Sequence, residues 1–203
     1  MRTMSKMIGI GGQMRMGKDT VGDIIAARTG MSKRAFAAAV KTLTSDLFKI
    51  PPSDIEGWKC NPENPPGMVV NMRTALQMVG DGMRQISPSV WIDKAMDVPS
   101  GIFCDVRYSN EAQAIRNNGG FTILVGRSAC LNDASNASEA HLRPVISWFL
   151  SNTSKTIVRV SELDGNEIPQ GASDFDWFVR NDTSLEALDL AIDALLTEQS
   201  GIK

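Results

Sequence analysis

The chain has 203 residues, of which 42% are hydrophobic and 22% charged, and its formal net charge is −2. These values predict one globular domain with a sizeable core, and they exclude a disordered chain and a protein whose bulk charge attracts nucleic acid. The three cysteines are scattered and there is a single histidine, which excludes a zinc cluster and a Ser-His-Asp hydrolase.

The first predicted elements are a strand at about 6–11, a glycine-rich loop at 12–17 and a helix at about 17–28, which Gly30 is expected to end. Glycines let successive backbone N–H groups point inward, and the helix N-terminus adds partial positive charge. A lysine at this place can follow a phosphoryl group during transfer. The stretch therefore predicts a nucleoside triphosphate site that consists of Gly12, Gln13, Met14, Arg15, Met16, Gly17, Lys18, Asp19 and Thr20.

One position departs from the usual G-x-x-x-x-G-K-[ST] pattern, which places a Mg²⁺-binding hydroxyl directly after the lysine. Asp19 stands there and Thr20 follows it. A carboxylate can bind the metal directly or through a water, so Asp19 is the candidate metal ligand. The alternative is that Asp19 only caps the helix.

A short strand is expected at 34–37 and a helix at 40–48. Residues 51–68 contain five prolines and two glycines, which predict an irregular segment. An amphipathic helix at 70–86 carries an apolar face formed by Met72, Ala75, Leu76, Val79, Met83 and Ile86.

Polar residues cluster on another face of the 70–86 helix. Arg73, Gln77 and Arg84 lie there within one narrow sector. The two arginines could clamp an acceptor phosphate through bidentate hydrogen bonds, or could form an ordinary solvated surface. Lys41, which follows the short second strand, is a further candidate to touch the acceptor.

Predicted strands at 102–105 and 121–125 flank a helix at about 110–118, for which Ser109 or Asn110 is the predicted N-cap. Residues 127–175 are the least regular part of the chain. A last strand is expected at 177–179, and a capping box at 183–186 opens a final helix.

This alternation predicts an α/β fold with a parallel sheet flanked by helices on both faces. Ligands of such sheets bind beyond the carboxyl ends of the strands. The glycine loop, Asp105, Arg127 and Asn181 each follow a predicted strand, so we expect them at one edge. Asp105 there would organise a metal or merely cap its strand, and Arg127 would act on the transferring phosphate.

Four blocks of the sequence together resemble the bacteriophage deoxynucleoside monophosphate kinases. Residues 12–20 resemble their G-x-x-x-x-G-K-D-T loop, and residues 72–80 resemble their R-x-x-L-Q-x-x-G helix. Residues 105–111 resemble their D-x-R-x-x-x-E block, and residues 181–188 resemble their N-D-G-S-L-E-E-L ending. The order and spacing of the blocks make this resemblance far more specific than the glycine loop alone.

The resemblance implies a P-loop NTPase fold of the nucleoside monophosphate kinase type. It implies one kinase domain over residues 1–203, with an irregular acceptor-side segment at about 51–68 and a lid-like insertion at about 127–175. The implied reaction transfers the ATP γ-phosphoryl group to a deoxynucleoside 5′-monophosphate, with ATP and Mg²⁺ as cofactors.

The resemblance also implies an enzyme of nucleotide biosynthesis. The three scattered cysteines fit reduced thiols and predict a cytoplasmic location, which is the host cytoplasm if the chain is phage-encoded. The chain's expected partners are small-molecule nucleotides. Nucleic acid is not expected because the net charge is −2, and a membrane is not expected because no apolar run approaches the length of a membrane span. The oligomeric state is left open, and a homodimer is one alternative.

Position by position, the resemblance places the loop on the donor phosphates and Asn181 near the donor adenine. The expected catalytic residues are Lys18, Asp105 and Arg127. The expected acceptor-binding residues are Lys41, Arg73, Gln77, Arg84, Asp105, Arg107 and Glu111.

Three features depart from the family pattern. Residues 135–139 replace a T-H-x-[ST]-E element, with Asn136 in place of the histidine. Residues 140–173 look longer than expected and suggest an extra hairpin. Thr183 replaces a glycine of the family's final block.

Two other functions stay open at this point. One is a kinase of another small acceptor, such as a phosphomevalonate-like or dephospho-coenzyme-A-like substrate. The other is a non-catalytic nucleotide-binding regulator. The cluster of Arg73, Arg84 and Arg107 favours a kinase over a regulator, because a regulator has no need of an acceptor-phosphate clamp.

Overall fold

The computed structural model describes residues 7–131, 140–163 and 168–200. These residues divide into two compact units. The larger unit consists of the chain up to Arg34 together with the chain from Pro99 onward, and the smaller unit is Ala35–Val98. Each unit is built around its own set of packed elements.

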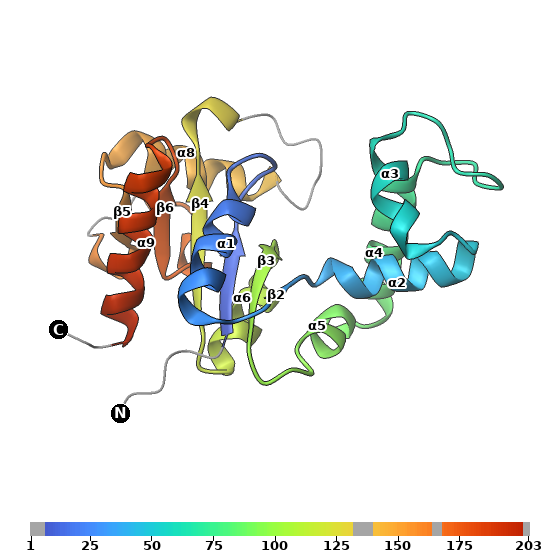
Figure 1. Cartoon of the computed structure of the whole chain (residues 1–203), viewed down its shortest axis with the longest axis horizontal. Coiled ribbons are helices and arrows are strands. Elements are labelled where there is room, and N and C mark those ends of the chain that lie inside the picture. The colour runs from blue at the N-terminus through green and yellow to red at the C-terminus, as the bar shows by residue number, and fades with distance from the viewer. Residues whose placement is uncertain (1–6, 132–139, 164–167, 201–203) are drawn as a thin grey trace. The chain divides into compact units, whose positions relative to one another are not determined.

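A six-stranded sheet forms the centre of the larger unit, in the order β2-β3-β1-β4-β6-β5 (Figure 1). Every neighbouring pair is parallel except β5 with β6, which is antiparallel. This confirms the predicted α/β fold with a mostly parallel sheet. The strands are β1 Met7–Gly11, β2 Lys33–Arg34, β3 Gly101–Val106, β4 Phe121–Gly126, β5 Ile157–Arg159 and β6 Trp177–Arg180.

Helices cover both faces of this sheet, as the alternating pattern predicts. Figure 1 shows α1 and α9 on the near face and α6 and α8 behind the strands. Because β1 and β4 are covered on both sides, their residues are buried without alternation, which is typical of central parallel strands. The helices are α1 Lys18–Thr29, α6 Ser109–Asn117, α8 Leu142–Asn152 and α9 Leu185–Ser200, with short 3₁₀ turns η2 Ser128–Cys130, η3 Val160–Glu162 and η4 Ala172–Asp174.

The ends of α1 and α9 follow from local chemistry. Gly30 ends α1 in the left-handed conformation, and its N–H donates to the Ala26 carbonyl at 2.9 Å, as the glycine predicts. At the start of α9, the Ser184 hydroxyl accepts from the Ala187 N–H at 3.2 Å. The cap is therefore one residue later than the predicted capping box places it.

The expectation that 127–175 is the least regular part of the chain is wrong at Leu142–Asn152, which form the helix α8. The extra hairpin expected at 140–173 is not formed among the described residues of that range, because its strand β5 pairs antiparallel with β6, which lies beyond it. Leu142, Val145, Ile146 and Phe149 are fully or almost fully buried and recur at helical spacing in α8. Pro144 lies in the first turn of α8, where its missing N–H is not needed, so it does not break the helix. The Phe149 ring stacks on Phe178 of β6 at 4.5 Å, which makes α8 part of the core.

The smaller unit is helical. Its elements are α2 Ala37–Phe48, η1 Pro52–Asp54, α3 Ile55–Cys60, α4 Met72–Ile86 and α5 Val90–Ala95. Ile50, Ile55 and Met72 form its buried cluster, with Trp58, Met68 and Leu76 packed against them. Asn71 caps α4 by accepting from the Thr74 N–H at 2.9 Å.

Three local expectations for this region differ from the structure. The strand predicted at 34–37 is confined to Lys33–Arg34, because Ala37 already begins α2. The proline-containing segment 51–68 includes the short helix α3. The apolar face of α4 stops before Ile86, whose exposed fraction is 79%.

Among residues 7–131, 140–163 and 168–200, no helix has the length and apolar character that a membrane crossing requires.

Candidate functional site

The glycine loop after β1 has the backbone of an anion-binding turn. Gly12, Arg15 and Gly17 all have positive φ, at 145°, 66° and 93°. Alternation between left-handed and ordinary conformations turns successive N–H groups toward a common concavity. Gly17 is also the N-cap of α1 and has no side-chain capping bond, so this end of the helix is open to an anion.

Lys18 lies over this loop. Its half-buried side chain donates from Nζ to the Gln13 carbonyl at 2.7 Å, which holds the ammonium group above the loop backbone. Gln13 and Met16 are buried, whereas Met14 and Arg15 point outward. A ligand here would therefore meet mainly backbone N–H groups and the Lys18 charge.

The loop is anchored to the ends of two other strands through Met16. The Asn181 side-chain amide, which follows β6, donates to the Met16 carbonyl at 2.9 Å. The Arg127 N–H, which follows β4, donates to the Met16 sulfur at 3.0 Å. The expectation that the loop, Arg127 and Asn181 meet at one edge of the sheet is therefore confirmed.

The turn after β6 also fixes the turn after β4. Asp182 accepts from the Ser128 N–H at 2.7 Å, from the Ser128 hydroxyl at 2.6 Å and from Arg180 at 2.9 Å. Burial works against ionisation of Asp182, but these hydrogen bonds outweigh it and lower its pKa. Sequence reasoning did not single out Asp182, although it stands beside Asn181 in the final family block.

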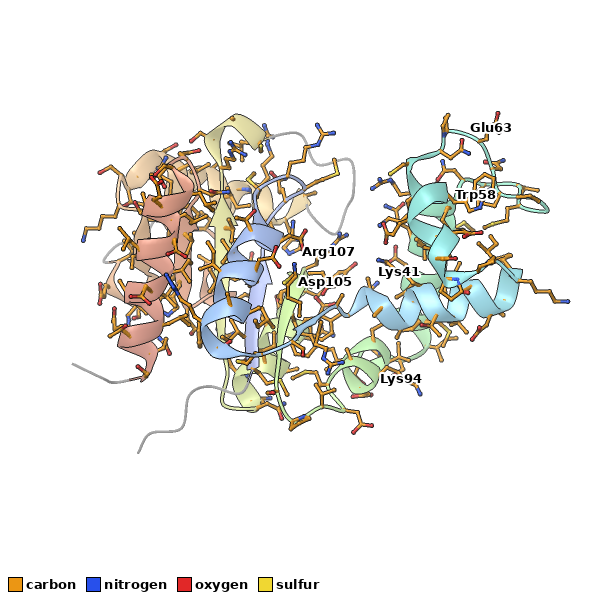
Figure 2. All side chains as sticks on the ribbon, in the orientation of Figure 1. Lys41, Trp58, Glu63, Lys94, Asp105 and Arg107 are labelled. Carbon is orange, nitrogen blue, oxygen red and sulfur yellow. The ribbon has the colours of Figure 1, made fainter. Side chains whose placement is uncertain are left out.

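Asp105 and Arg107 lie at the carboxyl end of β3 (Figure 2), and both are half-buried. Glu111 is only 3% exposed, and its carboxylate accepts from the Arg107 N–H at 2.8 Å and the Tyr108 N–H at 3.2 Å. Glu111 therefore holds the backbone of the turn that carries Arg107. Tyr108, and not the predicted Ser109 or Asn110, occupies the N-cap of α6.

Asp19 follows Lys18 in the first turn of α1 and has an 84% exposed side chain. One of its oxygens lies 3.4 Å from Lys33 Nζ, which also contacts Asp23 at 2.8 Å. The hydrogen bond to Asp23 and the charge of Asp19 raise the pKa of Lys33, against an opposing contribution from burial.

An exposed carboxylate next to the phosphate loop is the oxygen ligand that Mg²⁺ prefers, so Asp19 fits the predicted metal. The Lys33 ammonium would compete with the metal for this carboxylate. Across the described ranges, no group of three or more His, Cys, Asp or Glu side chains is arranged to hold a metal by itself.

Four predicted acceptor residues belong to the smaller unit. Arg73 and Gln77 are exposed on α4, and Arg84 lies 3.1 Å from Asp81. Lys41, labelled in Figure 2, forms an ion pair with Glu56, which also contacts Lys59 at 2.7 Å. The hydrogen bonds from these two lysines lower the pKa of Glu56 to about 2.

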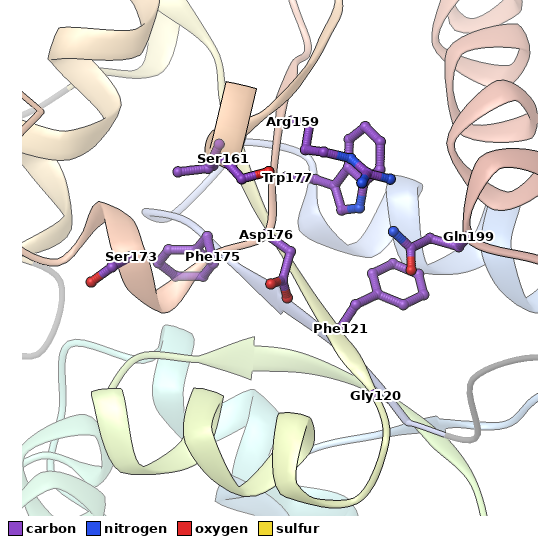
Figure 3. Close-up of a pocket in the computed structure, with 10 residues that line it drawn as sticks. Gly120, Phe121, Arg159, Ser161, Ser173, Phe175, Asp176, Trp177 and Gln199 are labelled. Atoms are coloured by element: carbon purple, nitrogen blue, oxygen red, sulfur yellow. The ribbon is translucent and has the colours of Figure 1, made fainter. Parts of the chain in front are cut away.

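A separate cavity of about 430 Å³ lies at the amino ends of β4 and β6 (Figure 3). Arg159 stacks over the Trp177 ring at 4.8 Å beside it and pairs with Glu198 at 2.6 Å. The phosphate loop lies at the carboxyl ends of the parallel strands, so this cavity is not part of the loop site.

No family model matches the chain. Over 163 residues it is 28% identical to a protein of Acanthamoeba polyphaga mimivirus named "Putative deoxynucleotide monophosphate kinase", in a match that covers 70% of this chain and 84% of that protein. The match confirms the family resemblance that the four sequence blocks predict. The predicted lid element at 135–139 lies outside the described residues.

Two solved structures are similar over nearly the whole chain. TT1252 from Thermus thermophilus aligns with a TM-score of 0.38 and 15% identity, covering 97% of this chain and 98% of that one. A sugar kinase from a Janibacter species aligns with a TM-score of 0.35 and 14% identity, covering 95% and 93% of the two chains.

Proposed function

We propose that the chain is a deoxynucleoside monophosphate kinase, which transfers the γ-phosphoryl group of ATP to a deoxynucleoside 5′-monophosphate and releases ADP and a deoxynucleoside diphosphate. The observation that carries the proposal is the phosphate loop with the Lys18 ammonium held above it at 2.7 Å from Gln13 O. The name of the mimivirus relative supports the choice of acceptor.

In the proposed reaction an oxygen of the acceptor phosphate forms a bond to the γ-phosphorus while the bond to the β–γ bridging oxygen breaks. No covalent bond to the protein is needed, so the protein acts by positioning and by charge. The loop N–H groups and Lys18 bind the donor phosphates, and Arg127 stabilises charge on the transferring group. Asp19, with Asp105, is proposed to hold Mg²⁺, which supplies neutralising charge to the phosphates when bound.

The acceptor residues are proposed from the resemblance together with their chemistry. Arg107 and Arg73 carry planar guanidinium groups, which bind phosphate oxygens in pairs. Arg73 is exposed to solvent on α4. Gln77, Arg84 and Lys41 complete the proposed acceptor set, and Glu111 supports it by holding the turn of Arg107.

The direct test is a coupled ADP-release assay with ATP, Mg²⁺ and a panel of deoxy- and ribonucleoside monophosphates. We expect turnover with at least one of dTMP, dGMP, dCMP and dAMP. Absence of turnover above background with all four at millimolar concentration overturns the proposal. ATP binding without turnover would then indicate a regulator, and turnover with another phosphorylated acceptor would indicate a kinase of that acceptor.

A further inference from the structure

The Asn181 side chain meets the phosphate loop where the loop is most constrained. The side-chain Nδ2 donates to the Met16 carbonyl at 2.9 Å, and the main-chain N–H of Asn181 donates to the Gly126 carbonyl at 2.8 Å. Gly17 follows Met16 with φ 93°, and a Cβ at this position would lie 2.1 Å from Asn181 Nδ2. Glycine is therefore required at position 17 both by the backbone conformation and by the amide group that fills the adjacent space.

The contact with Met16 sets the direction of one loop N–H group. The Met16 carbonyl and the Gly17 N–H belong to the same planar trans peptide, so they point in opposite directions. Asn181 draws the carbonyl to the side of β6, which turns the Gly17 N–H the other way. The same peptide is held from a second direction because the Met16 side chain is fully buried and accepts from the Arg127 N–H.

We propose that Asn181 is a positioning residue of the phosphate loop, which acts on donor phosphates through the Met16–Gly17 peptide and not through contact with the donor base. This inference rests on the proposed function and deepens it. It replaces the base-side role that the family resemblance implies for Asn181 with a role that is independent of the base.

The test compares ATP, which carries a base, with inorganic tripolyphosphate, which carries none. Binding of ATP and of inorganic tripolyphosphate is measured by calorimetry in EDTA-containing buffer, for the wild-type chain and for Asn181→Ala. Loss of the hydrogen bond removes one of the two restraints on the Met16–Gly17 peptide and weakens its orientation, so we expect both affinities to fall by the same factor, about five- to twentyfold.

A matched control is Asn118→Ala. Asn118 Nδ2 also donates to a main-chain carbonyl at 2.9 Å, that of Ala114, at the end of α6 that precedes β4. This variant should lose comparable thermal stability and keep both affinities. If Asn181→Ala does not fold, Asn181→Asp has nearly the same shape, and its ionised carboxylate cannot donate and repels the Met16 carbonyl. It should weaken both ligands at least as strongly.

The outcomes separate the inference from the proposed function. A wild-type chain that fails to bind tripolyphosphate overturns the phosphate-loop function itself. If the wild-type chain binds it, equal losses for the two ligands support positioning. A loss of affinity confined to ATP would show that Asn181 contacts the donor base. Unchanged affinities for both ligands would show that Asn181 has no role in donor binding. Either result overturns the inference.

Discussion

The phosphate loop and the arginine-bearing face of α4 are organised in opposite ways. The loop is main chain held at several points, by Lys18 at Gln13 O and by Asn181 and Arg127 at Met16. The face of α4 consists of long side chains, of which Arg73 and Gln77 are exposed to solvent. In the loop the main chain is fixed by several hydrogen bonds, whereas on α4 the Arg73 side chain is exposed to solvent.

This difference has an energetic consequence. A loop that is already ordered loses little conformational entropy on binding, so its groups can act at full strength on developing charge. An exposed arginine loses rotamer freedom when it binds, and that loss subtracts from its contribution to affinity. We therefore expect changes in the loop to act on kcat, and changes in α4 to act on the affinity for the acceptor.

The largest expected effect is that of Lys18→Ala. Removing the charge that faces the donor phosphates should lower kcat by about 10²-fold or more, as typically found when a stabilising group is lost. The melting temperature should change little because Lys18 is only half-buried. Steady-state kinetics and thermal melting of this variant, with exposed Lys155→Ala as the control, check both points. An unchanged kcat would show that Lys18 is not the phosphate lysine.

The next effect concerns the acceptor arginines. Arg73→Ala or Arg107→Ala should raise KM for the monophosphate by about ten- to a hundredfold, since a charged hydrogen bond contributes roughly 1.5–3 kcal/mol. KM for ATP should move much less. Substitution by lysine should restore little, because lysine cannot make the bidentate contact.

Arg116 offers a control for these arginines, because its guanidinium donates to the Ser173 carbonyl at 2.7 Å. Arg116→Ala should change stability and leave the monophosphate KM unaltered. If neither Arg73→Ala nor Arg107→Ala affects that KM, the proposed acceptor site is wrong and the contrast between the two regions loses its functional meaning.

A smaller effect is expected at the pair formed by Asp19 and Lys33. Asp19→Ala should raise the Mg²⁺ concentration needed for half-maximal activity more than it weakens ATP binding. Lys33→Ala removes the competing ammonium 3.4 Å from Asp19 and should lower that concentration by a few-fold. Titration of activity with Mg²⁺ and calorimetric Mn²⁺ binding measure both variants. Normal Mg²⁺ activation of Asp19→Ala would assign Asp19 to the electrostatics of the α1 N-terminus instead.

The smallest effect is on stability, at Glu56. Its folded pKa of about 2 lies below the ordinary value of 4.5, so the ionised form stabilises the fold above about pH 4.5, and this contribution is lost as the pH falls toward 2. Since the Glu56 side chain is 59% exposed, Glu56→Gln should cost no more than about 1 kcal/mol at pH 7. Denaturant unfolding from pH 7 to pH 3 should show the difference shrinking. A pH-independent difference would contradict the ion-pair origin.

The sequence predicted the elements whose local signals are strong. The loop, α1 and Gly30 each carry a motif or a terminating residue that depends only on neighbours in the chain. The amphipathic pattern likewise locates α4 to within two residues. Helix α8 was missed because Pro144 and the polar residues around it mask a helical repeat that only four buried side chains carry.

The internal contacts of the site were harder to predict, because they depend on the order of the strands. Met16 and Asn181 are 165 positions apart in the chain, and they meet only because β4 lies between β1 and β6. The pairing of Asp19 with Lys33 likewise requires β2 to lie beside β3, next to α1. A local sequence pattern does not indicate which distant residues the strand order brings into contact. The site residues could therefore be named from the sequence, but their partners could not.

The three cysteines differ in a way that offers an optical assay. Cys104 packs under α1, where a Cβ at Gly22 would lie 2.7 Å from its sulfur, and burial raises its pKa to about 11. At neutral pH this thiol stays protonated and should react slowly with alkylating reagents. Cys60 is exposed on α3, so a maleimide fluorophore should label it first. A dye at this position would report monophosphate binding to the smaller unit without any turnover.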